Sequence, residues 1–226
     1  MLTKTEQKFT GLFAIIVSIE LICGTFTELA TLHYFTKPFV VLSLLIFFLI
    51  QSQLVNKAIK TFTILALVSS LIGDIALLFD DINSSYFIIG LASFLLAHVM
   101  YVIVFLKQRH QKKNPLGFII LMLVYAAFLF YLLKDGLGDL LIPVVIYMIV
   151  ILSMSTAAYL RQNHNNTVSY NWVFTGAILF MLSDSILALD KFYEPFTLSS
   201  VGIMLTYALA QYCIVIGILK HNETLR

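Results

Sequence analysis

The chain has 226 residues, of which 60% are hydrophobic and 12% are charged, and its mean hydropathy is +0.96. Charged residues make up about 25% of a typical soluble domain, so this composition excludes a soluble globular domain, a disordered chain and a nucleic-acid-binding protein. The net charge of +2 gives no indication of an anionic partner. Cys23 and Cys213 both lie inside apolar runs and do not predict a disulfide framework.

Long apolar runs account for most of the chain. A helix needs about 20 mostly apolar residues to cross roughly 30 Å of hydrocarbon. Strands of a β-barrel would be about 10 residues long and would alternate apolar and polar residues. We therefore predict an all-α, polytopic bundle of eight transmembrane helices that forms one integral membrane domain over residues 1–226. In chain order, the predicted spans are residues 9–29, 38–54, 61–79, 86–106, 116–133, 140–160, 171–189 and 199–219.

Two of these runs need separate arguments. The run 9–29 is longer than the core of a signal peptide and contains Glu20, so we interpret it as the first span. The run 38–54 is the shortest, but the loop charges alternate between the two sides of the membrane only if it spans. Eight spans would bring both termini to the same side.

The basic residues predict the orientation. Of the 14 Lys and Arg residues, 11 fall on the side of the termini and 3 (Lys37, Lys134 and Lys191) fall on the other side. Positive loops remain in the cytoplasm, so we expect the N- and C-termini to be cytoplasmic, in a bacterial inner membrane or an endomembrane.

The chain also contains a weak internal repeat. Residues 71–80 align with residues 181–190 at an offset of 110, which aligns Asp74 with Asp184 and Asp80 with Asp190. The third and seventh spans would then be equivalent, as in two parallel four-helix repeats.

Four ionisable side chains lie well inside the predicted spans: Glu20, Asp74, His98 and Asp184. Each costs a few kcal/mol if it meets lipid, so we expect them to face the bundle interior and one another. Asp74 and Asp184 each lie five residues before the outer end of their predicted spans, which predicts equal heights. Glu20 also has a purely structural interpretation, because it lies near Gly24 in a helix-packing pattern.

We expect a polar pocket that opens outward. Asp74 and Asp184 are the candidate catalytic residues. The candidates for positioning substrate or water are His98, Tyr101, Tyr207, Gln211, Ser183 and Tyr147. Lys37 is a candidate phosphate contact or, equally, an interfacial anchor. The sequence has no GxSxG, HExxH, CxxC or phosphate-binding glycine loop, and it predicts no metal and no cofactor.

As an ordered set, the residues in the spans resemble the YhhN family of lysoplasmalogenase-like multi-pass membrane proteins. The matching pieces are Lys37-Pro38, Gly73-Asp74, Ala97-His98 with Tyr101, Pro143 with Tyr147, Ser183-Asp184-Ser185 followed by Leu187-Ala188-Leu189, and Tyr207 with Ala210-Gln211. Asp190 stands where an Asn is usual in the family.

The resemblance implies eight spans and hydrolysis of the vinyl-ether bond of a lysoplasmalogen, a lysophospholipid of the surrounding membrane. The products would be a fatty aldehyde and glycerophosphoethanolamine or glycerophosphocholine. This chemistry needs a carboxylic acid that keeps its proton, a negative group beside the developing oxocarbenium ion, and a positioned water. Glycosidases use two carboxylates against a similar cation, and Asp74 with Asp184 would supply such a pair.

Two other functions fit the same residues. A small-molecule or lipid transporter would also have a polar cluster near the midplane, but it should have broken helices at the site. A metal-dependent lipid hydrolase would use Asp74, His98 and Asp184 as ligands, although a zinc site normally has three or four protein ligands.

Overall fold

The structure, a computed structural model, describes residues 2–109, 113–162 and 167–223. In this part of the chain it forms α1 (Lys4–Thr25), α2 (Ala30–Gln51), α3 (Lys57–Leu77), α4 (Ser84–Lys107), α5 (Leu116–Leu133), α6 (Leu141–Tyr159), α7 (Thr167–Phe192) and α8 (Ser199–Glu223). Short 3₁₀ turns lie at Thr27–Leu29, Ser52–Leu54 and Gly138–Leu140. All eight helices are long and apolar enough to cross a membrane, so the predicted all-α, multi-pass fold is confirmed.

The second helix begins earlier than we predicted. The predicted span starts at residue 38, whereas α2 starts at Ala30 and contains Lys37 and Pro38 in its interior. Proline is common in the first turn of a helix and costly inside one, so the sequence favoured a start at this point. As a result, Lys37 lies on the body of a helix and not at its entrance.

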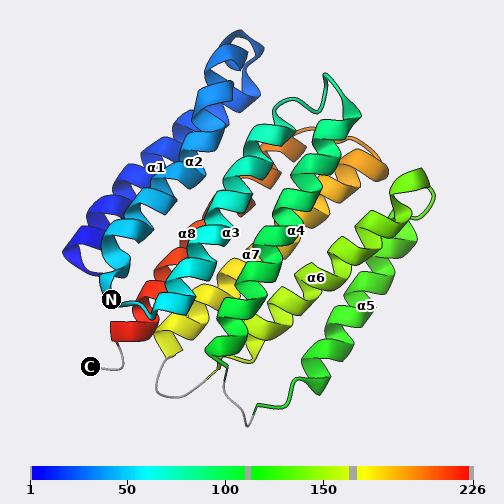
Figure 1. The fold of residues 1–226 in the computed structure, drawn as a ribbon. Coiled ribbons are helices and arrows are strands. Elements are labelled where there is room, and N and C mark those ends of the chain that lie inside the picture. The colour runs from blue at the N-terminus through cyan, green and yellow to red at the C-terminus, as the bar shows by residue number, and fades with distance from the viewer. Residues whose placement is uncertain (1, 110–112, 163–166, 224–226) are drawn as a thin grey trace.

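The helices form a flat bundle with two hairpins at its edges (Figure 1). The α1/α2 pair lies at one edge, the α5/α6 pair lies at the other, and α3, α4, α7 and α8 fill the centre. In the most apolar stretch of α8, 67% of the residues are buried inside the bundle; in the corresponding stretch of α5, only 17% are buried. Therefore α8 is the core helix, and α5 is the helix that packs least against the rest of the bundle.

Many, but not all, helix contacts recur with an offset of four, since α1–α8 and α5–α7 have no such counterpart among the described residues. The contacts α1–α2, α2–α3 and α3–α4 in the first half correspond to α5–α6, α6–α7 and α7–α8 in the second. Between the halves, α4 packs on α6 and α8 packs on α2. The third and fourth helices of each half form the most extensive pairs.

Glycines allow these central pairs to approach closely. A Cβ atom at Gly73 of α3 would lie 2.7 Å from the Phe94 ring of α4. A Cβ atom at Gly176 of α7 would lie 2.8 Å from the backbone oxygen of Ala210 in α8. Both distances are shorter than a carbon atom tolerates, so these two glycines allow α3 to pack closely on α4 and α7 on α8.

Polar contacts hold together the end of the bundle that carries the termini. Lys220 of α8 forms a buried ion pair with Glu6 of α1, with 2.7 Å between Nζ and Oε2. Arg161, just beyond α6, donates to Gln108 Oε1 at 2.6 Å and to Ser169 Oγ at 3.0 Å. Burial lowers the pKa of Arg161 to about 9. The start of α1 and the end of α8 therefore lie at the same end of the bundle, as eight spans require (Figure 1).

The candidate side chains lie mostly toward the opposite end. We call this the site end; it holds the C-termini of α3 and α7 and the N-termini of α4 and α8. The orientation of the bundle in a membrane remains a prediction, and two of the basic residues behind it, Lys112 and Arg226, lie outside the described residues.

Candidate active site

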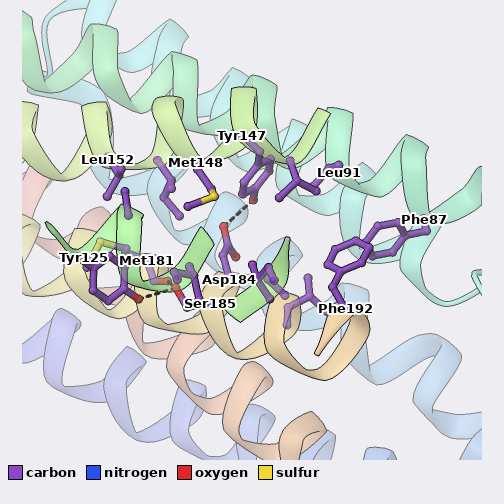
Figure 2. A pocket seen from close by; sticks show the side chains of 17 residues that line it. Phe87, Leu91, Tyr125, Tyr147, Met148, Leu152, Met181, Asp184, Ser185 and Phe192 are labelled. Atoms are coloured by element: carbon purple, nitrogen blue, oxygen red, sulfur yellow. Dashed lines mark hydrogen bonds between the residues drawn. The ribbon is translucent and has the colours of Figure 1, made fainter. Parts of the chain in front are cut away.

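Asp184 on α7 accepts a short hydrogen bond from α6. The Tyr147 hydroxyl donates to Asp184 Oδ2 at 2.5 Å (Figure 2). This is at the short end of the range for a hydroxyl donor and an oxygen acceptor. The Asp184 side chain is 14% exposed, so it is accessible to a small molecule but largely removed from water.

His98 on α4 lies beside the same carboxyl group. Its Nε2 atom is 3.6 Å from Asp184 Oδ2, and its side chain is completely buried. Tyr147 and Phe180 pack edge-on against the imidazole, with ring centroids at 5.3 Å and 4.5 Å. Neither ring nitrogen has a hydrogen-bond partner among the described residues. A buried imidazole without partners is costly, so a water or a substrate oxygen is needed beside His98 and Asp184.

An apolar cavity begins at Asp184. It has a volume of about 50 Å³ and is lined by α4, α5, α6 and α7. Its wall includes Phe87, Leu91, Leu129, Met148 and Phe192, and Asp184 is the one ionisable carboxyl group in its lining (Figure 2). The cavity lies beneath α5, the least buried helix. It therefore offers an acid at the end of a hydrocarbon-lined space.

Asp74 on α3 lies in a second polar group, formed with α4 and α8. Its side chain is 2% exposed, and Tyr207 donates to its Oδ2 at 2.9 Å. Tyr101 donates to Gln211 Oε1 at 2.6 Å, and the Gln211 amide donates to Ser70 Oγ at 2.9 Å. These buried hydrogen bonds cross-link α3, α4 and α8 around Asp74.

The two carboxyl groups have different partners. No hydrogen bond joins Asp74 to Asp184 within the described residues; Phe180 lies between the two groups, with its ring 4.5 Å from His98 and 5.4 Å from Tyr207. The helices continue for different lengths beyond the two aspartates, because α3 ends at Leu77, soon after Asp74, whereas α7 continues from Asp184 to Phe192. The third helix stops early because the chain turns at residues 78–83.

The repeat nevertheless gives each aspartate equivalent surroundings. Lys37 on α2 interacts electrostatically with Asp74, and at the same offset of 110 Tyr147 on α6 binds Asp184. A side chain from the fourth helix of the opposite half completes each group: Tyr207 at Asp74 and His98 at Asp184. The halves differ in that Lys37 corresponds to Tyr147, but each carboxyl group accepts a hydrogen bond from a phenol, Tyr207 at Asp74 and Tyr147 at Asp184.

The remaining predicted residues divide between the two groups. Ser183 is turned away from Asp184, and its hydroxyl donates to the Ile203 backbone carbonyl of α8 at 2.9 Å. Ser185 instead lines the apolar cavity and pairs with the Tyr125 hydroxyl of α5 at 2.6 Å (Figure 2). Sequence reasoning missed Tyr125, although a phenol in the otherwise apolar run 116–133 was an available signal.

A larger polar cavity lies on the other side of α7. It has a volume of about 210 Å³ and is lined by Glu20, His33, Lys37, Asp80 and Ser200 together with apolar side chains. Glu20 is almost fully buried, pairs with His33 at 3.0 Å between Oε1 and Nδ1, and accepts a hydrogen bond from Thr36. Glu20 thus belongs to a polar cavity as well as to a helix contact.

The geometry does not favour the two alternatives. Among the described residues, no group of three or more His, Cys, Asp or Glu side chains is arranged to hold a metal ion. The helices that carry the aspartates, α3 and α7, are continuous and contain no proline, whereas a transporter site of the expected type interrupts its helices.

A polytopic membrane protein with two interior aspartates, each held by a residue of a neighbouring helix, is therefore the class that fold and site define. The chain belongs to the YhhN family, whose pattern it matches over residues 32–218. All the paired side chains described around Asp74 and Asp184 fall inside this range.

Characterised relatives carry the name lysoplasmalogenase. The chain is 30% identical over 155 residues to lysoplasmalogenase TMEM86B from Homo sapiens, a match that covers 69% of this chain and 62% of that protein. It is 31% identical to lysoplasmalogenase TMEM86A from Bos taurus over 70% of this chain and 65% of that protein. A lysoplasmalogenase from Mycobacterium bovis is 28% identical over 61% of this chain and 52% of its own length. The chain thus matches less than two thirds of the length of these relatives. No solved structure matches it significantly.

Proposed function

We propose that this protein is a membrane-embedded hydrolase that cleaves the vinyl-ether bond of lysoplasmalogens. The observation that carries the proposal is the Asp184 group: a carboxyl group bonded to Tyr147 at 2.5 Å, 3.6 Å from a buried imidazole, at the end of an apolar cavity. The names of the relatives support the same activity.

The surroundings of the two aspartates favour different roles. Asp74 is 2% exposed and is separated from the Asp184 group by Phe180, so it does not border the apolar cavity. Asp184 lines the apolar cavity and is 14% exposed, so it can reach an alkenyl chain held there. Asp184 is therefore the proposed proton donor, and Asp74 is the proposed negative group that stabilises the cation.

The reaction then proceeds in three steps. Asp184 transfers its proton to the alkenyl carbon β to the ether oxygen, and an oxocarbenium ion forms. A water held by His98 and the Asp184 carboxylate adds to the carbon bonded to the oxygen and returns a proton to this pair. The hemiacetal collapses to the fatty aldehyde as its glycerol oxygen takes up a proton, so that one water is consumed overall.

The alkenyl chain is proposed to enter beneath α5. The apolar cavity of about 50 Å³ is much smaller than a fatty chain, so part of α5 must move aside or the chain must continue along the lipid-facing surface. The low burial of α5, 17% against 67% for α8, supports movement of this helix.

The termini are proposed to be cytoplasmic, with the site end in the opposite leaflet. The support is the 11 to 3 distribution of Lys and Arg between the two sides. This orientation is tested by fusing to the C-terminus a reporter that is active only in the cytoplasm. An active fusion is expected, and an inactive fusion would indicate the opposite orientation.

The activity is tested with the purified protein and 1-alkenyl-lysophosphatidylethanolamine in D₂O, with immediate reduction of the product. Proton transfer to carbon predicts a fatty alcohol with one deuterium on the carbon next to the former carbonyl. Fatty aldehyde without this label would exclude the proposed acid step, and absence of aldehyde would exclude the activity.

A further inference from the structure

The polar cavity of about 210 Å³ has no role in the cleavage steps, yet it adjoins the site. Leu187 on α7 lines both this cavity and the apolar cavity of Asp184. Lys37 lines the polar cavity and also acts on Asp74. The helix that carries Asp184, α7, therefore contributes to the walls of both cavities, and charged side chains line part of the second one.

The polar cavity is large enough for a ligand. A single water needs about 10–15 Å³ of such volume, so the cavity exceeds the space for one water by about tenfold or more. It has an opening at the site end, because Asp80 lies in the turn after α3 and Ser200 lies in the first turn of α8.

Charges of both signs line it. Lys37 is half-buried and makes no hydrogen bond within the described residues, so its ammonium group is available to an anion. Glu20 and Asp80 present carboxylates, although each already has one basic neighbour: His33 at 3.0 Å from Glu20, and Lys191 at 3.0 Å from Asp80. This arrangement is complementary to a zwitterion whose phosphate lies at Lys37 and whose cation lies at the carboxylates.

The lining also discriminates between cations. A primary ammonium donates three hydrogen bonds, which carboxylates accept, whereas a quaternary ammonium donates none and is usually bound by aromatic rings. No Phe, Tyr or Trp lines this cavity in the described part of the chain. The chemistry of the walls therefore matches ethanolamine better than choline.

We infer that the polar cavity binds the head group of the substrate and selects phosphoethanolamine over phosphocholine. Lys37 binds the phosphodiester, Glu20 and Asp80 bind the primary ammonium, and Leu187 separates the head group from the alkenyl chain. The inference rests on the proposed function for the identity of the substrate, but it concerns binding and can be tested without cleavage.

The probes are three non-cleavable 1-alkyl ethers: lysophosphatidylethanolamine, lysophosphatidylcholine and alkylglycerol. Affinity is measured from the ligand-dependent shift in thermal unfolding of the purified full chain in detergent. We expect the wild type to bind the ethanolamine ether about tenfold or more tightly than the choline ether, since a hydrogen bond to a charged group contributes about 1.5–3 kcal/mol.

Two variants separate the roles. Lys37→Met should weaken binding of both phospholipid ethers by about tenfold, because it removes the proposed contact with their phosphate. Binding of alkylglycerol, which has no phosphate, should be unchanged. Glu20→Gln should reduce the preference for ethanolamine and keep the hydrogen bond with Thr36. Lys134→Met is the matched control, because Lys134 is exposed beyond α5 and lies over Tyr131.

Equal affinity of the wild type for the two phospholipid ethers would overturn the inference, as would a Lys37→Met effect of the same size on alkylglycerol. These outcomes are independent of the proposed activity. If the protein discriminates between the head groups in binding but releases no aldehyde from alkenyl lipids, the head-group site is supported and the proposed hydrolase activity is wrong. If the protein releases aldehyde but binds the two head groups equally, only the head-group site is wrong.

Discussion

His98 Nε2 lies 3.6 Å from Asp184 Oδ2, in a position enclosed by the rings of Tyr147 and Phe180. This separation is too long for a direct hydrogen bond and too short for a water in line between the two atoms, so a water that contacts both must lie to one side of them. The two side chains come from α4 and α7, which belong to different halves of the bundle. The pair therefore depends on how the two halves pack against each other.

Replacing His98 tests the role of this water. His98→Gln keeps a polar side chain of similar size but cannot exchange a proton, so kcat should fall by about 100-fold while KM changes little. The measurement is steady-state aldehyde release with a lysoplasmalogen substrate, together with thermal unfolding to check the fold. A folded variant with wild-type kcat would remove His98 from the chemistry.

The hydroxyl of Tyr147 should matter more than that of Tyr125. Both phenols line the apolar cavity, but Tyr147 donates to Asp184 and Tyr125 pairs with Ser185. A hydrogen bond to a neutral group contributes about 0.5–1.5 kcal/mol, so Tyr147→Phe should lower kcat/KM by up to about tenfold. Tyr125→Phe is the matched control and should stay within about threefold of the wild type. Equal losses in the two variants would contradict the assigned geometry.

Filling the apolar cavity should exclude long chains. Ala126 on α5 lines the cavity, whereas its neighbour Ala127 is exposed on the lipid-facing side. Ala126→Trp is expected to raise KM for a long alkenyl chain much more than for a short one, because the added ring occupies the proposed chain path. Ala127→Trp should leave both unchanged. The comparison is made with two substrates that differ only in chain length, and a KM ratio unaffected by Ala126→Trp would argue against entry beneath α5.

The buried ion pair between Glu6 and Lys220 should stabilise the fold without affecting chemistry. Glu6→Gln removes the carboxylate of the buried ion pair with Lys220, which should lower the free energy of unfolding by about 3–5 kcal/mol. The double variant Glu6→Met with Lys220→Met should recover much of this loss, since no charge is then buried. The midpoint of thermal unfolding in detergent reports both effects, and a double variant less stable than Glu6→Gln would show that the pair is not the cause.

Much of the fold follows directly from the sequence, because each apolar run must satisfy its backbone hydrogen bonds within a helix. The start of α2 could not be predicted in this way. A proline such as Pro38 is typical of the first turn of a helix, and the polar residues His33 and Lys37 before it are not typical of a membrane span. His33 pairs with Glu20 of α1, a contact between helices that no local pattern reveals.

The site was predictable as a set of residues but not as an arrangement. Burial cost alone brings Asp74, His98 and Asp184 into the bundle interior. Their pairing was not predictable, because Tyr207 reaches Asp74 across the bundle and Phe180 lies between the two carboxyl groups. Lys37 and Tyr147 are also 110 residues apart, but their equivalence can be recognised only once the structure places each of them near an aspartate.

The measurement that tests the proposed mechanism most directly is aldehyde release by Asp184→Asn. An amide cannot donate a proton to carbon, so kcat should fall by about 10²–10⁴-fold, while affinity for the non-cleavable 1-alkyl ether stays near that of the wild type. Asp184→Asn that folds, binds the ether and releases aldehyde at the wild-type rate would contradict the assignment of Asp184 as the proton donor.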